Sequence, residues 1–118
     1  MSNAAEGCLF CRIAAGEIPA TKIYEDDNVV VFEDVNPQAP THLLVIPRRH
    51  ISSLDELKDG DQQMIGEVLV RAAAIARDQH LTEAGYRVVI NCGEGAGQSV
   101  FHVHAHVLSG RRLNWPPG

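Results

Sequence analysis

Three histidines alternate along one short stretch of the chain, at His102, His104 and His106. An imidazole can attack phosphorus as a nucleophile, bind a metal ion or transfer a proton to a leaving group. On a regular strand these side chains share one face, about 6.6 Å between neighbours and about 13 Å between the outer pair, while the apolar residues between them face the core. A zinc–nitrogen bond is about 2.0–2.1 Å long, so one ion can take two of these histidines but not all three. We therefore expect the three to have different roles, the alternative being solvated histidines on an exposed face.

A glycine-rich segment, residues 91–99, comes directly before the histidines. Its three glycines allow sharp turns and let backbone N–H groups approach an anion. By itself the segment is weak evidence, because an ordinary turn between two strands has the same composition. Next to the hydroxyl of Ser99 and three imidazoles, it predicts a phosphate-binding loop beside a nucleophile. A second imidazole or the hydroxyl is then available to stabilise charge or to protonate the leaving group.

The elements that position these residues are predicted from local patterns. A short helix is expected after Cys8, ended by Gly16 and Pro19, and one long helix over residues 61–79, where apolar residues recur with the helical period. Strands are predicted at residues 23–25, 29–33, 42–46, 86–91 and 101–108. The first two are expected to form a hairpin that turns at the acidic segment of residues 26–28. Only one helix is long enough to connect parallel strands. We therefore expect an α+β fold, a mostly antiparallel five-stranded sheet with its helices on one side.

The bulk composition argues against several classes of function. The 118-residue chain has a formal net charge of −5 with both signs mixed along it, which argues against a nucleic-acid partner or an anionic membrane surface. No apolar run is long enough to span a bilayer, and no secretory leader is recognisable. Three cysteines, an odd number, indicate a reducing cytoplasm and no disulfide framework. We interpret residues 1–4 as the remnant of an expression tag and residues 5–118 as one domain.

Beyond these patterns, the chain resembles the histidine-triad (HIT) family over nearly its whole length. The family signature, three alternating histidines followed by two apolar residues, corresponds to residues 102–108. Further similar positions lie at Phe10 and at residues 12–13, 17–19, 24–27, 37–42, 45–47 and 50–51. The tail, at residues 110–111 and 114–118, resembles the branch of nucleotide-binding phosphoramidases.

The resemblance implies an activity and a role for each site histidine. Members of this branch hydrolyse purine nucleoside 5′-phosphoramidates and acyl-nucleotides to nucleoside monophosphates through a nucleotidyl-histidine intermediate. The nucleophile then falls on His104, and the histidine that contacts the phosphate and stabilises charge falls on His106. Ser99 corresponds to the hydroxyl near the leaving group. His42 corresponds to a further site histidine, although by itself it could be an edge residue of its strand.

The nucleotide implied by the family is a purine nucleotide of the AMP or GMP type. The residues around its phosphate correspond to Asn91, Gly97, Gln98 and Val100. Asp34 corresponds to the carboxylate that accepts hydrogen bonds from the ribose, although by itself it could be a turn residue. The apolar slot for the base corresponds to Leu9, Phe10, Ile13, Phe32 and Val35. Without the resemblance, most of these apolar residues are explained equally well as core.

A second possible site begins with the pair Cys8 and Cys11. Their spacing is that of a zinc knuckle, but a four-ligand site needs two more donors. The same spacing occurs in redox motifs and in packed thiols, so three interpretations remain open. The resemblance implies His50 and His102 as the missing ligands of a structural zinc ion, which the chemistry itself does not require. Cys92 has no partner in this scheme.

The resemblance also implies a C2 homodimer whose sheet continues across the interface. Its contacts come from the long helix and the strand at residues 86–91, with Trp115 of each tail near the partner's leaving group. Two rival functions remain. One is a nucleotide-binding interaction module with incidental turnover, against which the presence of a nucleophile argues. The other is a dinucleoside polyphosphate hydrolase, against which the tail at residues 115–118 argues.

Overall fold

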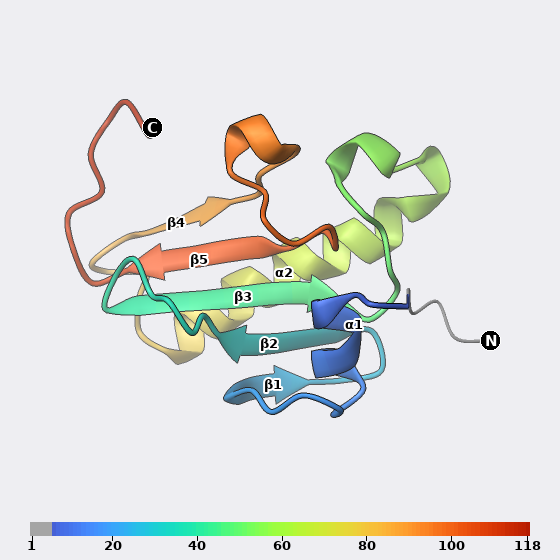
Figure 1. Ribbon diagram of the computed structural model, residues 1–118. Coiled ribbons are helices and arrows are strands. Elements are labelled where there is room, and N and C mark those ends of the chain that lie inside the picture. Colours follow the sequence, from blue (N-terminus) through green and yellow to red (C-terminus); the bar gives the residue numbers. More distant parts are fainter. Residues whose placement is uncertain (1–5) are drawn as a thin grey trace.

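The computed structural model describes residues 6–118, so the tag remnant predicted at residues 1–4 lies outside the described residues. The helices are α1 (Leu9–Ala14) and α2 (Gln62–Asp78), with short 3-10 turns at Leu54–Glu56, Asp59–Asp61 and Glu94–Ala96. The strands are β1 (Lys22–Glu25), β2 (Val29–Glu33), β3 (Thr41–Pro47), β4 (Tyr86–Val89) and β5 (Ala105–Ser109). They form one sheet in the order β1-β2-β3-β5-β4 with every pair antiparallel, which confirms the predicted α+β class (Figure 1). No helix in this part of the chain is both long and apolar enough to cross a membrane.

The β1–β2 hairpin turns at the acidic segment where a turn was predicted. The carboxylate of Asp26 accepts hydrogen bonds from the backbone N–H groups of Asn28 and Val29, both at 2.8 Å. These bonds replace missing strand pairing at the turn and so fix the hairpin. The first four residues of β2 are all buried, because both faces of the sheet are covered at this strand.

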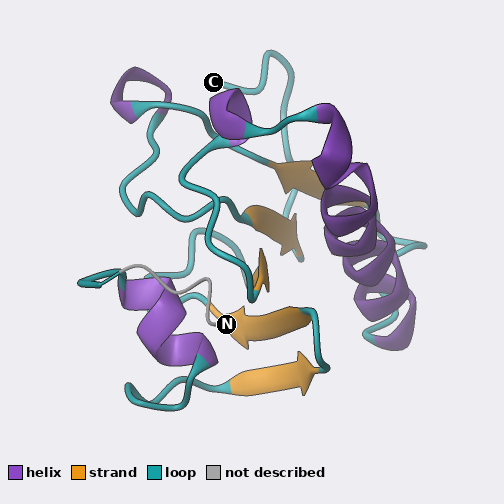
Figure 2. Ribbon diagram, turned by 90° about the vertical axis from the view of Figure 1, so that its right-hand side faces the viewer, coloured by secondary structure: helices purple, strands orange, loops and turns teal. Residues whose placement is uncertain are grey.

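The two helices cover opposite faces of the sheet (Figure 2). On one face, α2 packs over a core that includes Val31 and Val45. On the other face, Phe10 of α1 packs against Phe32 and Ile46. The expectation that the helices lie on one side was therefore wrong. Both faces of these strands are buried, so their side chains are apolar on either side. The hydrophobic pattern of the strands therefore does not reveal which face each helix covers.

The last strand is shorter than predicted, because it begins at Ala105 and not at residue 101. Its pairing with β3 ends at Val45 opposite Ala105. The preceding segment leaves the sheet, and the N–H of Val103 bonds instead to the carbonyl of Ile51 at 2.7 Å. Of the three alternating histidines, only His106 therefore lies in a strand.

Candidate active site

The three histidines lie on the side of the sheet that α1 covers. Ala105 and Val107 are buried in the opposite core, beneath α2. The ring of Phe10 lies edge-on to His104 with 5.0 Å between ring centroids, and His104 is 4.9 Å from His106 by the same measure. The predicted common face is thus present although the backbone is irregular before β5. The alternative of a solvated face is wrong, because only 5% of His104 is exposed.

The backbone determines which nitrogen of His104 can act as a nucleophile. Nδ1 of His104 lies 2.7 Å from the carbonyl oxygen of His102. A carbonyl oxygen only accepts hydrogen bonds, so Nδ1 carries the proton and donates it. The lone pair of the neutral ring is therefore on Nε2. Burial lowers the pKa of His104, which keeps the ring neutral and nucleophilic at pH 7.

A chain of hydrogen bonds determines the proton position on His106. The backbone N–H of Gln38 donates to Nδ1 of His42 at 2.9 Å, which leaves the proton of a neutral His42 on Nε2. That Nε2–H lies 2.8 Å from Nδ1 of His106 and 3.3 Å from a carboxylate oxygen of Asp34. His106 therefore accepts at Nδ1 and carries its own proton on Nε2, where it can donate to a substrate phosphate.

Burial is also the main cause that keeps the other site histidines neutral. It lowers the pKa of His42, against the opposing charge of Asp34. It lowers the pKa of His106 to about 4, with a further contribution from the neighbouring His104 and His42. Two adjacent imidazoles with opposite properties result, a lone pair on His104 and a donor on His106. This arrangement suits attack on an anionic phosphorus centre, because the attacking ring is neutral and its neighbour can bond to phosphate oxygens.

The glycine-rich loop between β4 and β5 is held in place by Gln98, which is 2% exposed. Its Oε1 accepts from the N–H of Gly93 at 2.8 Å, and its Nε2 donates to the carbonyls of Ser52 at 2.7 Å and Val100 at 3.1 Å. These three hydrogen bonds give Gln98 a role in ordering the loop, and its predicted place beside the phosphate remains a prediction. Gly97 has a φ of +96°, a left-handed conformation that favours glycine.

The remaining predicted phosphate residues surround this loop. A Cβ built on Gly97 would lie 3.7 Å from the side-chain nitrogen of Asn91, so these two residues are adjacent. Asn91 is half-buried and Ser99 is exposed. Their predicted contacts with substrate remain predictions.

The residues predicted to bind the base are divided between core and surface. Phe10, Ile13 and Phe32 are buried in one cluster, and Val100 packs against it. Their interpretation as core is confirmed, and their contact with a base remains a prediction. The other two members are exposed, 43% for Leu9 and 97% for Val35. Trp115 in the tail is also exposed, at 82%.

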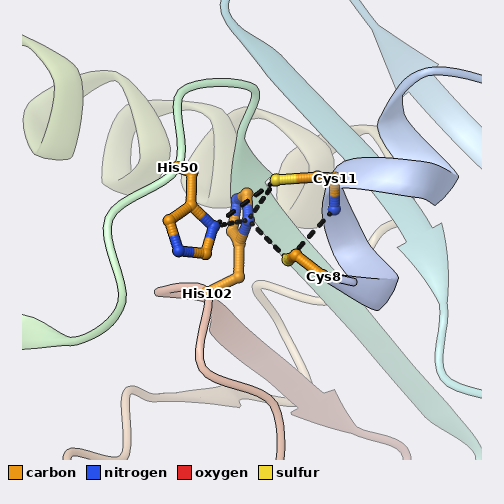
Figure 3. Close-up of side chains that lie close together, drawn as sticks. All are labelled: Cys8, Cys11, His50 and His102. Atoms are coloured by element: carbon orange, nitrogen blue, oxygen red, sulfur yellow. Dashed lines mark hydrogen bonds between the residues drawn. The ribbon is translucent and has the colours of Figure 1, made fainter. Parts of the chain in front are cut away.

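The four predicted metal ligands converge on one point, where the sulfurs of Cys8, the N-cap of α1, and Cys11 within α1 face two imidazoles from the segments after β3 and before β5 (Figure 3). Nδ1 of His102 lies 3.4 Å from the sulfur of Cys8, 3.4 Å from that of Cys11 and 3.3 Å from Nδ1 of His50. Bonds of about 2.3 Å to sulfur and about 2.0–2.1 Å to nitrogen place tetrahedral ligands about 3.6 Å apart for sulfur–nitrogen pairs and about 3.3 Å for nitrogen pairs. The cluster therefore has the donor set of a closed zinc site, and these separations fit the edges of such a site.

The proton of His102 lies on the nitrogen that points away from this cluster. Nε2 of His102 lies 2.7 Å from the carbonyl oxygen of Pro47, to which it donates. Its Nδ1 lone pair is therefore directed at the other three ligands, as metal binding requires. The carbonyls of Pro47 and Ile51 are functional groups that sequence reasoning missed. Every residue carries a carbonyl, so no residue type indicates which ones orient a ligand or a nucleophile.

Known proteins resemble this chain in sequence and in fold. A sequence model of the HIT domain matches residues 15–113. The chain is 46% identical over 112 residues to the 14 kDa zinc-binding protein of Zea mays, covering 93% of this chain and 87% of that protein. It is 50% identical to the crystal structure of a HIT family hydrolase from Legionella pneumophila, with a TM-score of 0.93 and coverage of 95% and 100%. For the histidine triad nucleotide-binding protein from Candida albicans, the identity is 32%, the TM-score 0.80 and the coverage 93% and 83%. With its triad, its sheet and its sequence in agreement, this chain belongs to the HIT domain family.

Proposed function

We propose that the protein is a hydrolase that cleaves purine nucleoside 5′-phosphoramidates and acyl-nucleotides to nucleoside monophosphates. The observation that carries the proposal is the pair of ring tautomers, a lone pair on Nε2 of His104 beside a proton on Nε2 of His106. A module that only binds nucleotides does not need a buried, neutral nucleophile. Structural similarity to a HIT family hydrolase and to a histidine triad nucleotide-binding protein supports the same class of substrate.

The reaction follows from these tautomers in two steps. In the first, Nε2 of His104 attacks the α-phosphorus and the phosphorus–nitrogen bond to the amine breaks. The hydrogen bond from Nδ1 to the His102 carbonyl stabilises the positive charge that develops on the ring, while His106 donates to the phosphate oxygens. The departing amine gains a proton, a step for which Ser99 is the nearby hydroxyl in the family pattern. In the second, water attacks phosphorus and gives up a proton to solvent, the bond to His104 breaks with its electron pair returning to Nε2, and the monophosphate leaves.

The nucleoside part of the substrate is proposed to lie on the α1 side of the sheet. The cluster of Phe10, Ile13 and Phe32 supplies apolar surface for a purine, with Leu9 and Val35 exposed at its edge. The side chain of Asp34 is 19% exposed, so it can accept hydrogen bonds from ribose hydroxyls while it contacts His42. This combination favours a nucleotide over a simple phosphate ester.

We infer that the Cys8, Cys11, His50 and His102 cluster binds one zinc ion. The observed ligand separations fit a tetrahedral ion, and the similar plant protein is named for zinc binding. Zinc in such a closed site supplies folding free energy, and its thiolate ligands suit a reducing compartment such as the cytoplasm. Elemental analysis of protein purified without added metal is expected to give one zinc per chain. A value near zero would instead support packed thiols.

We also propose a homodimer formed through α2 and β4. β4 is an edge strand of the sheet, and its Val88 is exposed. On α2, Leu69 and Val70 are exposed as well. An open strand edge beside apolar side chains is suited to pairing with a second copy. Arg87 of β4 donates to the carbonyls of Leu113 and Asn114, which ties the tail to this edge strand and supports the proposal that Trp115 contacts the partner subunit.

The experiment that tests the function compares three substrates in one assay: an adenosine phosphoramidate with an amine leaving group, an acyl-AMP and a diadenosine polyphosphate. The proposal predicts the highest kcat/KM for the phosphoramidate. Preference for the diadenosine compound would favour the polyphosphate hydrolase. Nucleotide binding without turnover of any of the three would favour the binding module.

A further inference from the structure

We propose that the metal cluster of Cys8, Cys11, His50 and His102 positions the nucleophile and the phosphate loop, so that metal occupancy controls the geometry of catalysis as well as stability. An ion held by these four residues would have a closed set of protein ligands and no position left for the substrate. Its ligands act through the backbone and are therefore positioning residues. Only the activity part of this inference rests on the proposed hydrolase function.

The first connection is His102, which belongs to both sites. Its side chain is fully buried and directs Nδ1 at the two sulfurs and at His50. Its own backbone carbonyl accepts the hydrogen bond that places the proton of His104 on Nδ1. A movement of His102 out of the cluster therefore moves the acceptor that determines where the lone pair of the nucleophile lies. No other group is needed between metal ligand and nucleophile.

The second connection runs through the residue after His50. The carbonyl of Ile51 accepts from the N–H of Val103 at 2.7 Å. This N–H and the carbonyl of His102 are the two ends of one peptide unit. The N–H end of this peptide unit is therefore held by Ile51, which follows the metal ligand His50 in sequence. Its carbonyl end accepts from Nδ1 of His104 and so orients that ring. Hydrogen bonds in such a chain also polarise one another, which strengthens the carbonyl as an acceptor.

The third connection reaches the glycine-rich loop. The carbonyl of Ser52, two residues after His50, accepts from the side-chain amide of Gln98, which in turn accepts from Gly93. Residues 51–53 have no regular secondary structure. Their position therefore depends on these hydrogen bonds and on His50, the ligand that joins them to the cluster.

The helix that supplies the thiolates also contacts the nucleophile directly. Phe10 lies between Cys8 and Cys11 in sequence, and its ring is 5.0 Å from that of His104 at an interplanar angle of 86°. The sulfur of Cys8 accepts from the N–H of Cys11 at the start of the helix, so the cluster and the helix start are one unit. Release of the ion would free the helix start and loosen this edge-on contact.

The test compares zinc-loaded and metal-free wild-type protein by nitrogen-15 NMR of the imidazoles, at a temperature where both are folded. In the loaded protein we expect a single Nδ1–H tautomer for His104 with a slowly exchanging proton. In the metal-free protein we expect mixed tautomers and faster exchange, with kcat lower by about 10- to 100-fold per folded molecule. An unchanged tautomer and exchange rate in folded metal-free protein would overturn the proposal.

Two comparisons keep this test decisive. Cys8→Ser is expected to reproduce the metal-free spectrum, whereas Arg12→Ala, a change at an exposed position of α1 outside the cluster, is expected to match wild type. If metal-free protein does not fold, cadmium-loaded protein replaces it: the larger ion should shift the His104 Nδ1–H resonance, and an unshifted resonance would overturn the proposal. A loaded enzyme that cleaves no phosphoramidate would refute the proposed function, while the NMR comparison would still decide this inference.

Discussion

Replacing His42 with asparagine or with glutamine tests its two hydrogen bonds one at a time, because each variant keeps one bond and loses the other. Its Nδ1 accepts from the N–H of Gln38 at 2.9 Å, and its Nε2 donates to His106 at 2.8 Å. The amide of asparagine reaches the position of Nδ1 only, so His42→Asn keeps an acceptor for Gln38 and loses the donor to His106. The amide of glutamine reaches the position of Nε2, so His42→Gln keeps that donor and loses the acceptor.

The size of the effect follows from the negative charge on the phosphate oxygens to which His106 donates in the transition state. A hydrogen bond to a group that carries charge contributes about 1.5–3 kcal/mol. Because a change of about 1.4 kcal/mol in the barrier is tenfold in rate, His42→Asn should lower kcat by about 10- to 150-fold. KM should change little, because the bond matters most in the transition state. His42→Gln should retain kcat within about fivefold, at a cost of about 1 kcal/mol in stability from the lost acceptor.

The assay is steady-state hydrolysis of an adenosine phosphoramidate, with urea unfolding of each variant to verify that both are folded. Equal losses of kcat in the two variants would mean that packing at this buried position matters and the donor does not. Wild-type kcat in His42→Asn would refute the hydrogen-bond chain from His42 to His106 as a source of catalysis.

Three further predictions concern pH, the loop and the tail. The folded state holds the pKa of His106 at about 4, whereas the unfolded chain takes up a proton near the ordinary value of 6.5. The free energy of unfolding should therefore fall as the pH falls from about 6.5 to about 4. Urea unfolding at several pH values tests this, and His106→Gln should show a weaker dependence of the unfolding free energy on pH. Gln98→Leu leaves the buried loop contacts with Gly93 and Ser52 unsatisfied, so unfolding by urea should show a loss of at least about 2 kcal/mol, together with a higher KM. Deletion of residues 113–118 should leave a dimer in sedimentation but alter the preference among amine leaving groups; a monomeric wild type or an unaltered preference would contradict the role given to the interface or to the tail.

The sequence predicted the elements and the chemistry-bearing side chains because both leave patterns in residue type. The alternating histidines predicted a shared face, and the acidic turn at Asp26 predicted the β1–β2 hairpin. The same patterns could not locate α1 and α2 on opposite faces, because the uniformly apolar β2 is compatible with a core on either side. They also placed the start of the last strand too early, since the N–H of Val103 is diverted to the backbone of Ile51.

The candidate site shows the same division between side chains and backbone. Its imidazoles and thiols were identified from the sequence and the family resemblance. The structure brings the two thiols together with His50 and His102, and His42 and His104 together with His106. What the sequence could not provide is the protonated nitrogen of each ring. That choice depends on the backbone carbonyls of Pro47 and His102 and on the N–H of Gln38, which no residue type encodes. The loop-ordering role of Gln98 was missed for a related reason, because its partners are backbone groups, one of them on the distant Ser52.

The central claim is that Nε2 of His104 forms a covalent bond to phosphorus. The most direct measurement is rapid quenching of the enzyme with an adenosine phosphoramidate, followed by fragmentation mass spectrometry of the peptide that contains residues 102–106. We predict an adenylyl group on His104 that forms before AMP is released, and no adduct in His104→Ala, which should still bind nucleotide. Full turnover with no adduct at any time, or an adduct on His106 in the wild type, would contradict the proposed mechanism.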